Sequence, residues 1–216
     1  MKKIGIIGSG PVGKSLAKGF MKNKHQIMLG TRSTQKQEQI RNEFHNEIQT
    51  GDFAKAAEYG EIIVLAVSGI HAKNALALCG DKNLKGKIII DVTNPIDENP
   101  PKNGVVSFFT NYNESLMEQL QKAFPTCHFV KAFNSVTNEL MVNPKFNGTK
   151  PTMFICGNES NAKKEVAEIL EKFGWETEDM GAIEASRAIE ALCMLYCIPG
   201  IKDNKWNHAF KLLKTK

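Results

Sequence analysis

The chain has 216 residues, of which 42% are hydrophobic and 24% are charged. This composition is typical of a folded globular protein and excludes the disordered and fibrous classes. The length suits one α/β domain rather than two. The formal charge of +5 comes from 28 basic and 23 acidic residues. Because the lysines are spread along the chain and no nucleic-acid-binding motif accompanies them, we predict no nucleic-acid partner.

The N-terminus and the cysteines bear on the compartment. The residues before Gly8 leave no room for the apolar stretch of a secretory signal peptide. Apolar runs such as 62–67 are far shorter than the roughly 20 residues of a membrane helix. The five cysteines include no C-x-x-C pair, and we interpret them as reduced thiols, most of them in the core. We therefore expect a cytoplasmic protein with no membrane segment and no metal site.

Short apolar runs rich in β-branched residues alternate with helical patterns along the chain, which predicts an α/β fold. Buried parallel strands are expected at residues 3–7, 26–30, 62–67, 87–92, 128–132 and 153–156. The first helix presents Val12, Leu16 and Phe20 on one face toward the sheet. Residues 96–111 interrupt the alternation and are expected to form a loop.

Three further helices are expected in the second half of the chain. The first is capped by Asn113 or Ser115 and runs through Leu120. The second spans residues 161–173. The third is strongly apolar, spans residues 182–198 and is closed by Pro199-Gly200, and a short amphipathic tail follows it.

The strongest motif is Gly8-Ser9-Gly10-Pro11-Val12-Gly13, which matches G-x-G-x-x-G. The motif follows the first expected strand directly and opens the first helix, the context that makes it informative. Gly8 permits the tight turn, Gly10 lets the backbone approach a pyrophosphate, and Gly13 allows the helix to pack closely on the strand. The pyrophosphate would lie at the positive end of the helix. The alternative is a tight strand-to-helix turn without a ligand.

The end of the second strand indicates which dinucleotide binds. An acidic residue there would hydrogen-bond the ribose 2′-hydroxyl of NAD, but the chain reads Gly30-Thr31-Arg32-Ser33. Two hydroxyls and the planar guanidinium of Arg32 suit a 2′-phosphate, and Lys36 could assist. We therefore predict NADP(H) as the cofactor. The alternative is a solvated turn that caps the next helix.

Residues after the other strands meet at the carboxyl edge of the sheet, where open α/β sheets bind ligands. The cofactor-binding candidates at this edge are Ala66, Val67, Ser68, Ile70, Asn94, Pro95, Ala132, Phe133 and Asn134. The asparagines could hydrogen-bond the nicotinamide ribose or carboxamide, or could be turn residues, and the apolar side chains, Phe133 among them, could wall the ring. His71 is the candidate catalytic residue, as a hydrogen-bond or proton donor; alternatively it only begins a helix.

With these residues in view, the chain resembles the 8-hydroxy-5-deazaflavin:NADPH oxidoreductases, the deazaflavin-dependent NADP oxidoreductase family, along nearly its whole length. The blocks that carry the resemblance are residues 4–10, 29–32, 91–95, 130–134, 186–192 and 209–213. It implies a Rossmann-type, doubly wound, mostly parallel sheet in a single domain spanning 1–216, with a core at 1–150 and a C-terminal strand and helix extension at 151–216. It also implies NADP(H) and a homodimer built through the late helices.

The resemblance implies roles for particular residues too. Thr31 and Arg32 match positions that hold the 2′-phosphate, residues 9, 11 and 12 match contacts of the glycine loop, and His71 lies where deazaflavin-using members tend to carry histidine. Ser68-Gly69, however, replaces a proline and a bulky aromatic residue of some members, which leaves the wall over the nicotinamide less filled.

We therefore expect an oxidoreductase that transfers hydride between NADPH and a small-molecule acceptor, a deazaflavin or flavin, while the protein aligns the two. The departure at Ser68-Gly69 leaves the acceptor open. One alternative is an NADPH-dependent reductase of a quinone, a metal chelate or an imine. Another is a non-catalytic NADP(H) sensor.

Overall fold

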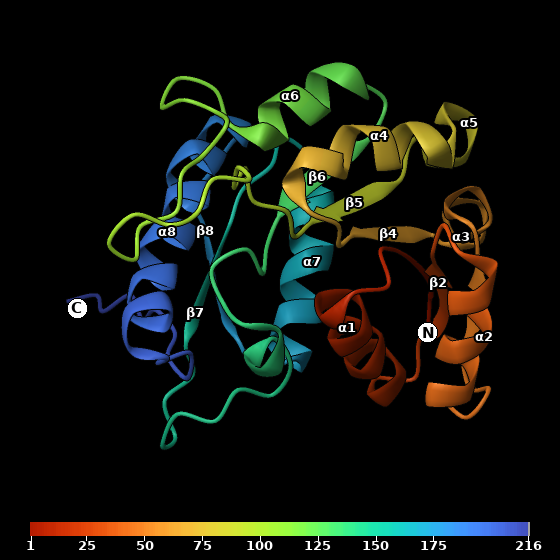
Figure 1. Ribbon diagram of the computed structural model, residues 1–216, viewed down its shortest axis with the longest axis horizontal. Helices are drawn as coiled ribbons and strands as arrows, with labels where there is room; N and C mark the ends of the chain where they lie inside the picture. The colour runs from red at the N-terminus through yellow and green to blue at the C-terminus, as the bar shows by residue number, and fades with distance from the viewer. Residues whose placement is uncertain (216) are drawn as a thin grey trace.

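Six parallel strands form the main sheet, in the order β3-β2-β1-β4-β5-β6. They are β1 (Lys3–Ile7), β2 (Gln26–Gly30), β3 (Gln49–Gly51), β4 (Ile62–Leu65), β5 (Ile88–Asp91) and β6 (His128–Lys131). Figure 1 shows β2, β4, β5 and β6 of this sheet with helices around them. This computed structural model describes residues 1–215. The strand order reverses between β1 and β4, as in doubly wound dinucleotide-binding sheets. The predicted α/β, Rossmann-type fold class is confirmed.

Helices cover both faces of this sheet, which explains why its central strands are apolar throughout. The helices are α1 (Pro11–Lys22), α2 (Thr34–Glu43), α3 (Phe53–Tyr59), α4 (Gly69–Cys79), α5 (Asp81–Leu84), α6 (Leu116–Ala123), α7 (Ser160–Lys172) and α8 (Ser186–Asp203). Helices α1, α2 and α7 contribute to the apolar core on one face, and α3, α4 and α6 to the core on the other. As one consequence, all four residues of β4 are buried.

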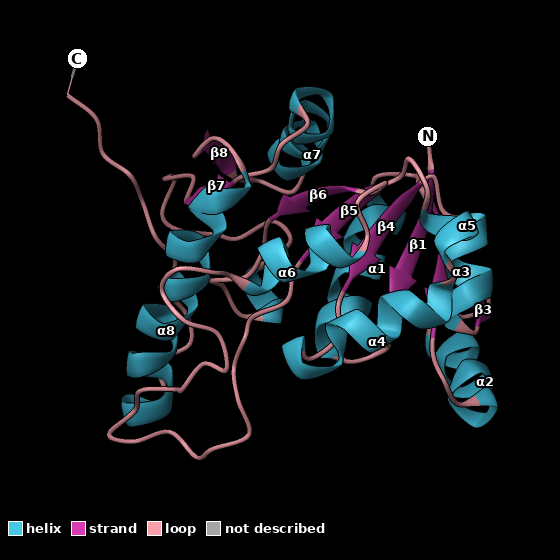
Figure 2. Ribbon diagram, turned by 90° about the horizontal axis from the view of Figure 1, so that it is seen from above, coloured by secondary structure: helices cyan, strands magenta, loops and turns pink. Residues whose placement is uncertain are grey.

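The C-terminal part adds a second, two-stranded parallel sheet of β7 (Thr152–Ile155) and β8 (Glu176–Asp179), joined by α7. Figure 2 shows β7, β8 and α8 beyond β6, at the opposite end of the main sheet from β3. The backbone N–H of Lys131 in β6 donates to the carbonyl of Cys156 at 3.1 Å. The expected C-terminal strand and helix extension is thus present and is attached to the edge of the main sheet.

Two strands were missed by the sequence prediction. Strand β3 is the three-residue segment Gln-Thr-Gly at the edge of the sheet, and β8 reads Glu-Thr-Glu-Asp. Neither has the apolar run used to predict strands, because each pairs on one side only and leaves its side chains partly in solvent. Pairing with a neighbour, rather than local composition, makes these segments strands.

The prediction that Pro199-Gly200 closes the late helix was wrong. Helix α8 runs through Pro199 and ends at Asp203, and the capping residue Asn204 adopts a left-handed conformation with φ 53°. A tertiary contact accompanies this continuation: a Cβ at Gly200 would lie 2.4 Å from the Trp206 ring, so the tail packs directly on the last turn. Residues Ile183–Ala185, expected in the same helix, form a separate 3₁₀ turn. Within residues 1–215, no helix combines the length and apolarity needed to span a membrane.

The capping residue of α6 is Ser115, one of the two candidates. Its hydroxyl accepts from the N–H of Glu118 at 3.1 Å, and the Glu118 carboxylate accepts from the N–H of Ser115 at 2.7 Å. This reciprocal pair is a capping box. The first turn of α6 is therefore fixed by its own side chains.

Candidate functional site

The glycine loop joins β1 to α1 in a conformation that larger residues could not adopt. Gly8 has φ +122°, and a Cβ there would lie 2.2 Å from the carbonyl oxygen of Ala66. A Cβ at Gly13 would lie 2.0 Å from the carbonyl oxygen of Gly8, so α1 packs directly on the turn. At Gly10, in contrast, a Cβ would meet nothing within 4 Å. The backbone at Gly10 is therefore open to a ligand.

The first turn of α1 is also open. Gly10 is its N-cap in an extended conformation, Pro11 follows, and no side chain caps the helix. The N–H groups of this first turn consequently keep their donor capacity, and the helix dipole adds positive potential at the same place. This end of α1 is suited to bind an anion.

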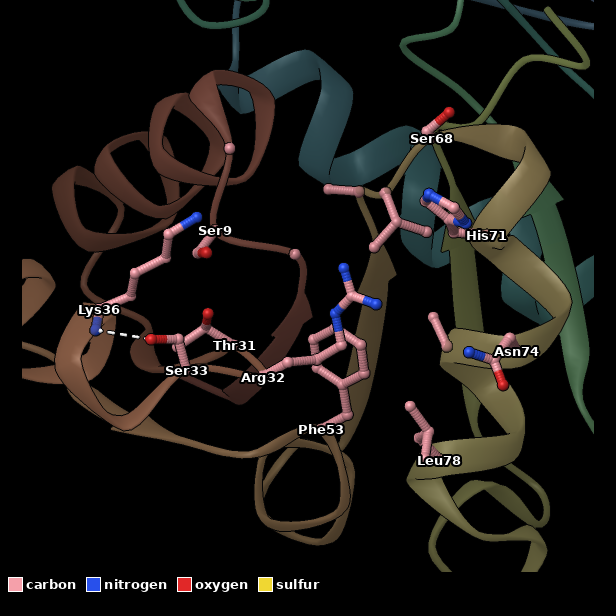
Figure 3. Close-up of a pocket in the computed structure, with 15 residues that line it drawn as sticks. Ser9, Thr31, Arg32, Ser33, Lys36, Phe53, Ser68, His71, Asn74 and Leu78 are labelled. Carbon is pink, nitrogen blue, oxygen red and sulfur yellow. Dashed lines mark hydrogen bonds between the residues drawn. The ribbon is translucent and has the colours of Figure 1, made fainter. Parts of the chain in front are cut away.

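A cavity of about 350 Å³ opens beside the glycine loop (Figure 3). Its volume is within the usual range for small-molecule sites. The predicted site residues that line it are Gly8, Ser9, Gly10, Thr31, Arg32, Ser33, Lys36, Ala66, Val67, Ser68 and His71. They follow β1, β2 and β4, so the carboxyl edge of the sheet brings these three segments together.

The end of β2 contributes the charged part of the cavity. Thr31 is buried, and its N–H donates to the carbonyl of Gly51 at 2.9 Å. Arg32 is exposed and its guanidinium points into the cavity, while the Lys36 side chain extends toward the glycine loop (Figure 3). Among residues 1–215, no Asp or Glu lines this cavity. Two cations therefore face the cavity without a carboxylate to neutralise them there.

Ser33 has the capping role that was the alternative for this turn. Its Oγ accepts from the N–H of Lys36 at 3.3 Å and so caps α2. Since a hydroxyl can donate while it accepts, the Ser33 O–H is still able to donate to a ligand in the cavity.

His71 lies in the first turn of α4, where its N–H donates to the carbonyl of Ser68 at 2.9 Å. Its exposed ring lines the cavity between Ser68 and Asn74 (Figure 3). It thus both begins a helix, as in the alternative interpretation, and faces the predicted cofactor site.

The residues predicted after β5 and β6 do not line this cavity. The Asn94 amide donates to the carbonyl of Asn134 at 2.7 Å, and the Asn134 amide donates to Asn94 Oδ1 at 3.2 Å and to the carbonyl of Ile189 at 2.8 Å. Pro95 and Ala132 are buried, and Ile70 is partly exposed outside the cavity lining. The asparagines therefore connect the β5 and β6 loops to α8.

The structure contradicts the prediction that the Phe133 side chain is a wall for the nicotinamide ring. This side chain is 1% exposed and belongs to the core, with its ring centroid 6.0 Å from that of Phe173. The residue has φ 62°, so the backbone turns sharply after β6 and directs the ring inward. Phe133 is thus unavailable as a wall for a nicotinamide ring. Val12 and Gly13 likewise support the loop from the α1 side and do not line the cavity.

The sequence analysis missed one wall of the cavity. This wall consists of Phe53 at the start of α3 and Asn74, Ala75 and Leu78 on α4. The available signal was helical spacing, since residues 71, 74, 75 and 78 recur at steps of three and four and share one face. Leu78 lies on that face and is half-exposed in the structure.

A buried ion cluster lies at the other end of the same sheet edge and was also missed. Lys131 Nζ lies 2.7 Å from Asp91 Oδ2, 2.8 Å from Glu190 Oε1 and 2.9 Å from the carbonyl oxygen of Thr93, and all three charged side chains are buried. Glu190 also accepts from the N–H groups of Leu116 and Met117. Burial would lower the pKa of Lys131, but the two carboxylates raise it above its usual value. The cluster joins β5, β6, α6 and α8.

Comparisons with known proteins agree with this geometry. A family model described as NADP oxidoreductase, coenzyme F420-dependent, matches residues 3–95, the part that contains the glycine loop and the cavity. The metalloreductase STEAP3 of Rattus norvegicus is 29% identical over 191 residues, which are 88% of this chain and 36% of that protein. The chain therefore spans about a third of the length of this curated relative.

Solved structures also resemble the whole chain, among them the following two. The hypothetical protein SMa0349 from Sinorhizobium meliloti has a TM-score of 0.73 at 22% identity, covering 100% of this chain and 97% of that one, which shows the shared fold. A candidate F420-dependent NADP reductase from Arthrobacter sp. FB24 has a TM-score of 0.92 at 30% identity, covering 99% of this chain and 100% of that one. Coenzyme F420 is an 8-hydroxy-5-deazaflavin, so the resemblance found in the sequence is confirmed. The chain belongs to the family of coenzyme F420-dependent NADP oxidoreductases.

Proposed function

We propose that the protein transfers hydride between NADPH and a deazaflavin- or flavin-like acceptor. The observation that carries this proposal is the cavity in which Arg32 and Lys36 face no carboxylate, beside an uncapped helix N-terminus. An uncompensated cationic cavity of this kind suits a ligand with phosphate groups at two points.

The cofactor would be held in three parts. The pyrophosphate would lie on the glycine loop at the start of α1. The 2′-phosphate would accept hydrogen bonds from Arg32, Lys36 and the hydroxyls of Thr31 and Ser33. The nicotinamide would extend past Ser68 toward the β5 loop, at the reversal of strand order where such sheets bind ligands.

When bound, NADPH supplies the hydride from its nicotinamide ring. The task of the chain is to hold that ring in one orientation and to limit access of water. The hydrogen bonds between Asn94, Asn134 and α8 would keep the β5 and β6 loops fixed during this step. His71 remains the candidate proton donor, because its exposed ring borders the cavity and is free to reach a bound molecule.

Reduction of a metal chelate is the second candidate. The observation that favours it is the 29% identity to a metalloreductase over 88% of this chain. The same NADPH site would serve either acceptor. The two candidate functions therefore differ only in the acceptor that would lie against the nicotinamide ring.

The working unit is proposed to be a homodimer in the cytoplasm. Leu195 and Ile201 are 56% and 37% exposed on α8, and a second copy of this helix would cover them. All five cysteines are free thiols, which suits a reducing compartment. Light scattering of the protein and of a Leu195→Glu variant tests the dimer: we expect twice the mass of the chain for the protein and the single mass for the variant.

The acceptor is tested by following NADPH oxidation with coenzyme F420, FMN, a quinone, a ferric chelate and a cyclic imine in parallel. Fast turnover with F420 or FMN supports the proposal. Turnover with the ferric chelate alone, without added flavin, would favour the second candidate. Selective NADPH binding without turnover of any acceptor would contradict both and indicate a sensor.

A further inference from the structure

The dipeptide Asn-Gly occurs twice in the chain, and both copies form the same kind of turn. Asn103 and Gly104 have φ 53° and 85°, and Asn147 and Gly148 have φ 45° and 83°. Two successive residues with positive φ define a type I′ turn, in which Asn-Gly is the preferred pair. The two sites therefore match in dipeptide sequence and in backbone conformation.

The first of these turns is held in place by the rest of the protein. Two backbone hydrogen bonds between Lys102 and Val105 close it, each 3.0 Å long. A Cβ at Gly104 would lie 2.4 Å from Lys202 Cγ, so the turn packs directly on the last turn of α8. Asn103 can leave its conformation only if these hydrogen bonds and this packing are lost.

The second turn is open to solvent. Within residues 1–215 a single backbone hydrogen bond closes it, from the N–H of Thr149 to the carbonyl of Phe146 at 2.8 Å. Residues 147–150 are all exposed, and a Cβ at Gly148 would meet nothing within 4 Å. A hollow of about 560 Å³ beside the turn is lined by residues 143–150 and Gly174. This turn can therefore change conformation without disturbing the core.

An asparagine that precedes a glycine can react with the backbone. The glycine nitrogen attacks the side-chain carbonyl carbon of the asparagine, a succinimide ring closes, and the displaced amide leaves as ammonia with the glycine N–H proton. Water then opens the ring at either carbonyl and gives aspartate or isoaspartate, so no oxidant or cofactor is consumed. Glycine favours this attack because it has no Cβ and its backbone is permissive. Ring closure also requires the asparagine to leave the turn conformation, so the freedom of the turn controls the rate.

We propose that Asn147 is a deamidation site of this protein and that packing on α8 protects Asn103, which has the same dipeptide sequence. The product places a carboxylate between Lys145 and Lys150 and removes one unit from the formal charge of +5. Isoaspartate also adds a methylene group to the backbone, which the open turn can accommodate. The site lies outside the cavity beside the glycine loop, so this inference does not depend on the proposed function.

The test is peptide mapping by mass spectrometry after the folded protein has been kept in warm, mildly alkaline buffer. We expect aspartate and isoaspartate to accumulate at residue 147, with an equal amount of ammonia released. Asn103 should react about tenfold more slowly, a factor that one additional backbone hydrogen bond can supply. In protein unfolded by urea, where neither turn persists, the two sites should react at similar rates.

Two variants separate the chemistry from the protection. Asn147→Gln places the side-chain carbonyl one methylene farther from the backbone, and should abolish the fast reaction while Asn103 reacts as before. Lys202→Ala removes the exposed side chain that covers Gly104, and should speed the reaction at Asn103 without changing that at Asn147. Circular dichroism would verify that both variants fold.

Two results would overturn the inference. Equal rates at the two sites in the folded protein would show that α8 gives no protection. An Asn147 that reacts much more slowly in the folded protein than in urea would show that its turn is not free to rearrange. Calorimetric titration of the aged protein with NADPH should give the affinity of the fresh protein; failure of the fresh protein to bind NADPH would contradict only the proposed function.

Discussion

The cavity beside β2 and the buried cluster around Lys131 lie at the same edge of one sheet. The charged side chains are paired with opposite charges in the cluster but not in the cavity. In the cluster, the Lys131 ammonium has three oxygen atoms within 3 Å, and both carboxylates accept further hydrogen bonds from the protein. In the cavity, Arg32 and Lys36 face no carboxylate among the lining residues. Charges satisfied within the protein hold the fold together, whereas charges left open on a concave wall are available to a ligand.

The free-energy cost of placing charged side chains in the two regions differs accordingly. Burial of an ion pair removes its hydration, and the hydrogen bonds around it must compensate. The exposed cations of the cavity keep their hydration until a ligand arrives. Substitutions in the cluster should therefore act on the free energy of unfolding, and substitutions in the cavity on ligand affinity.

The largest effect is expected at the cluster. Lys131→Met would leave Asp91 and Glu190 buried without a positive charge, and should lower the free energy of unfolding by about 3–5 kcal/mol. Urea unfolding measures this change, with the exposed Lys73→Met as the matched control. If the variant does not fold, Glu190→Gln, which keeps an acceptor oxygen, should fold with a smaller loss. A loss below about 1 kcal/mol in Lys131→Met would show that the cluster does not stabilise the fold.

The next effect is on ligand affinity. Arg32→Ala should weaken NADPH binding by about 1.5–3 kcal/mol, the range for hydrogen bonds to charged groups, and leave the stability of the protein unchanged. NADH, which has no 2′-phosphate, should be almost unaffected. Equal losses for both nucleotides in calorimetry would contradict the assignment of the phosphate to Arg32.

Ser33 both caps a helix and lines the cavity. Its variants can therefore distinguish an effect on stability from an effect on ligand affinity. Ser33→Ala removes the N-cap of α2 and should lower the free energy of unfolding by about 1 kcal/mol. Ser33→Asp keeps a capping oxygen but repels a phosphate, so it should retain stability and weaken NADPH binding. An Asp variant that binds NADPH as tightly as the natural protein would exclude the Ser33 hydroxyl from the phosphate site.

The last prediction is a pH dependence at an ion pair of intermediate exposure. Burial raises the pKa of Glu118, but hydrogen bonds from Arg187 and Ser115 outweigh this and lower it to about 2. Since the folded pKa lies below the ordinary value of 4.5, the stabilisation is complete above about pH 4.5 and is lost as the pH falls toward 2. Urea unfolding across this range should show the difference between the protein and Glu118→Gln narrowing with acid; a constant difference would contradict the assignment.

The two regions also differ in how far the sequence predicts them. The glycine loop and the Thr31-Arg32-Ser33 turn are contiguous, and their chemistry follows from local pattern. The cluster has no such pattern: Asp91 and Lys131 become neighbours only through the register of β5 and β6, and Glu190 arrives on α8. The cavity wall on α4 depends likewise on which face that helix turns to the sheet. Phe133 was misassigned because the backbone turn that directs its ring inward is set by tertiary packing.

The most direct test of the central claim is calorimetric titration of the purified protein with NADPH and with NADH. The uncompensated cations at the end of β2 predict that NADPH binds at one site and that NADH binds at least tenfold more weakly. Equal affinities, or no binding of either nucleotide, would contradict the account of this cavity as an NADP(H) site.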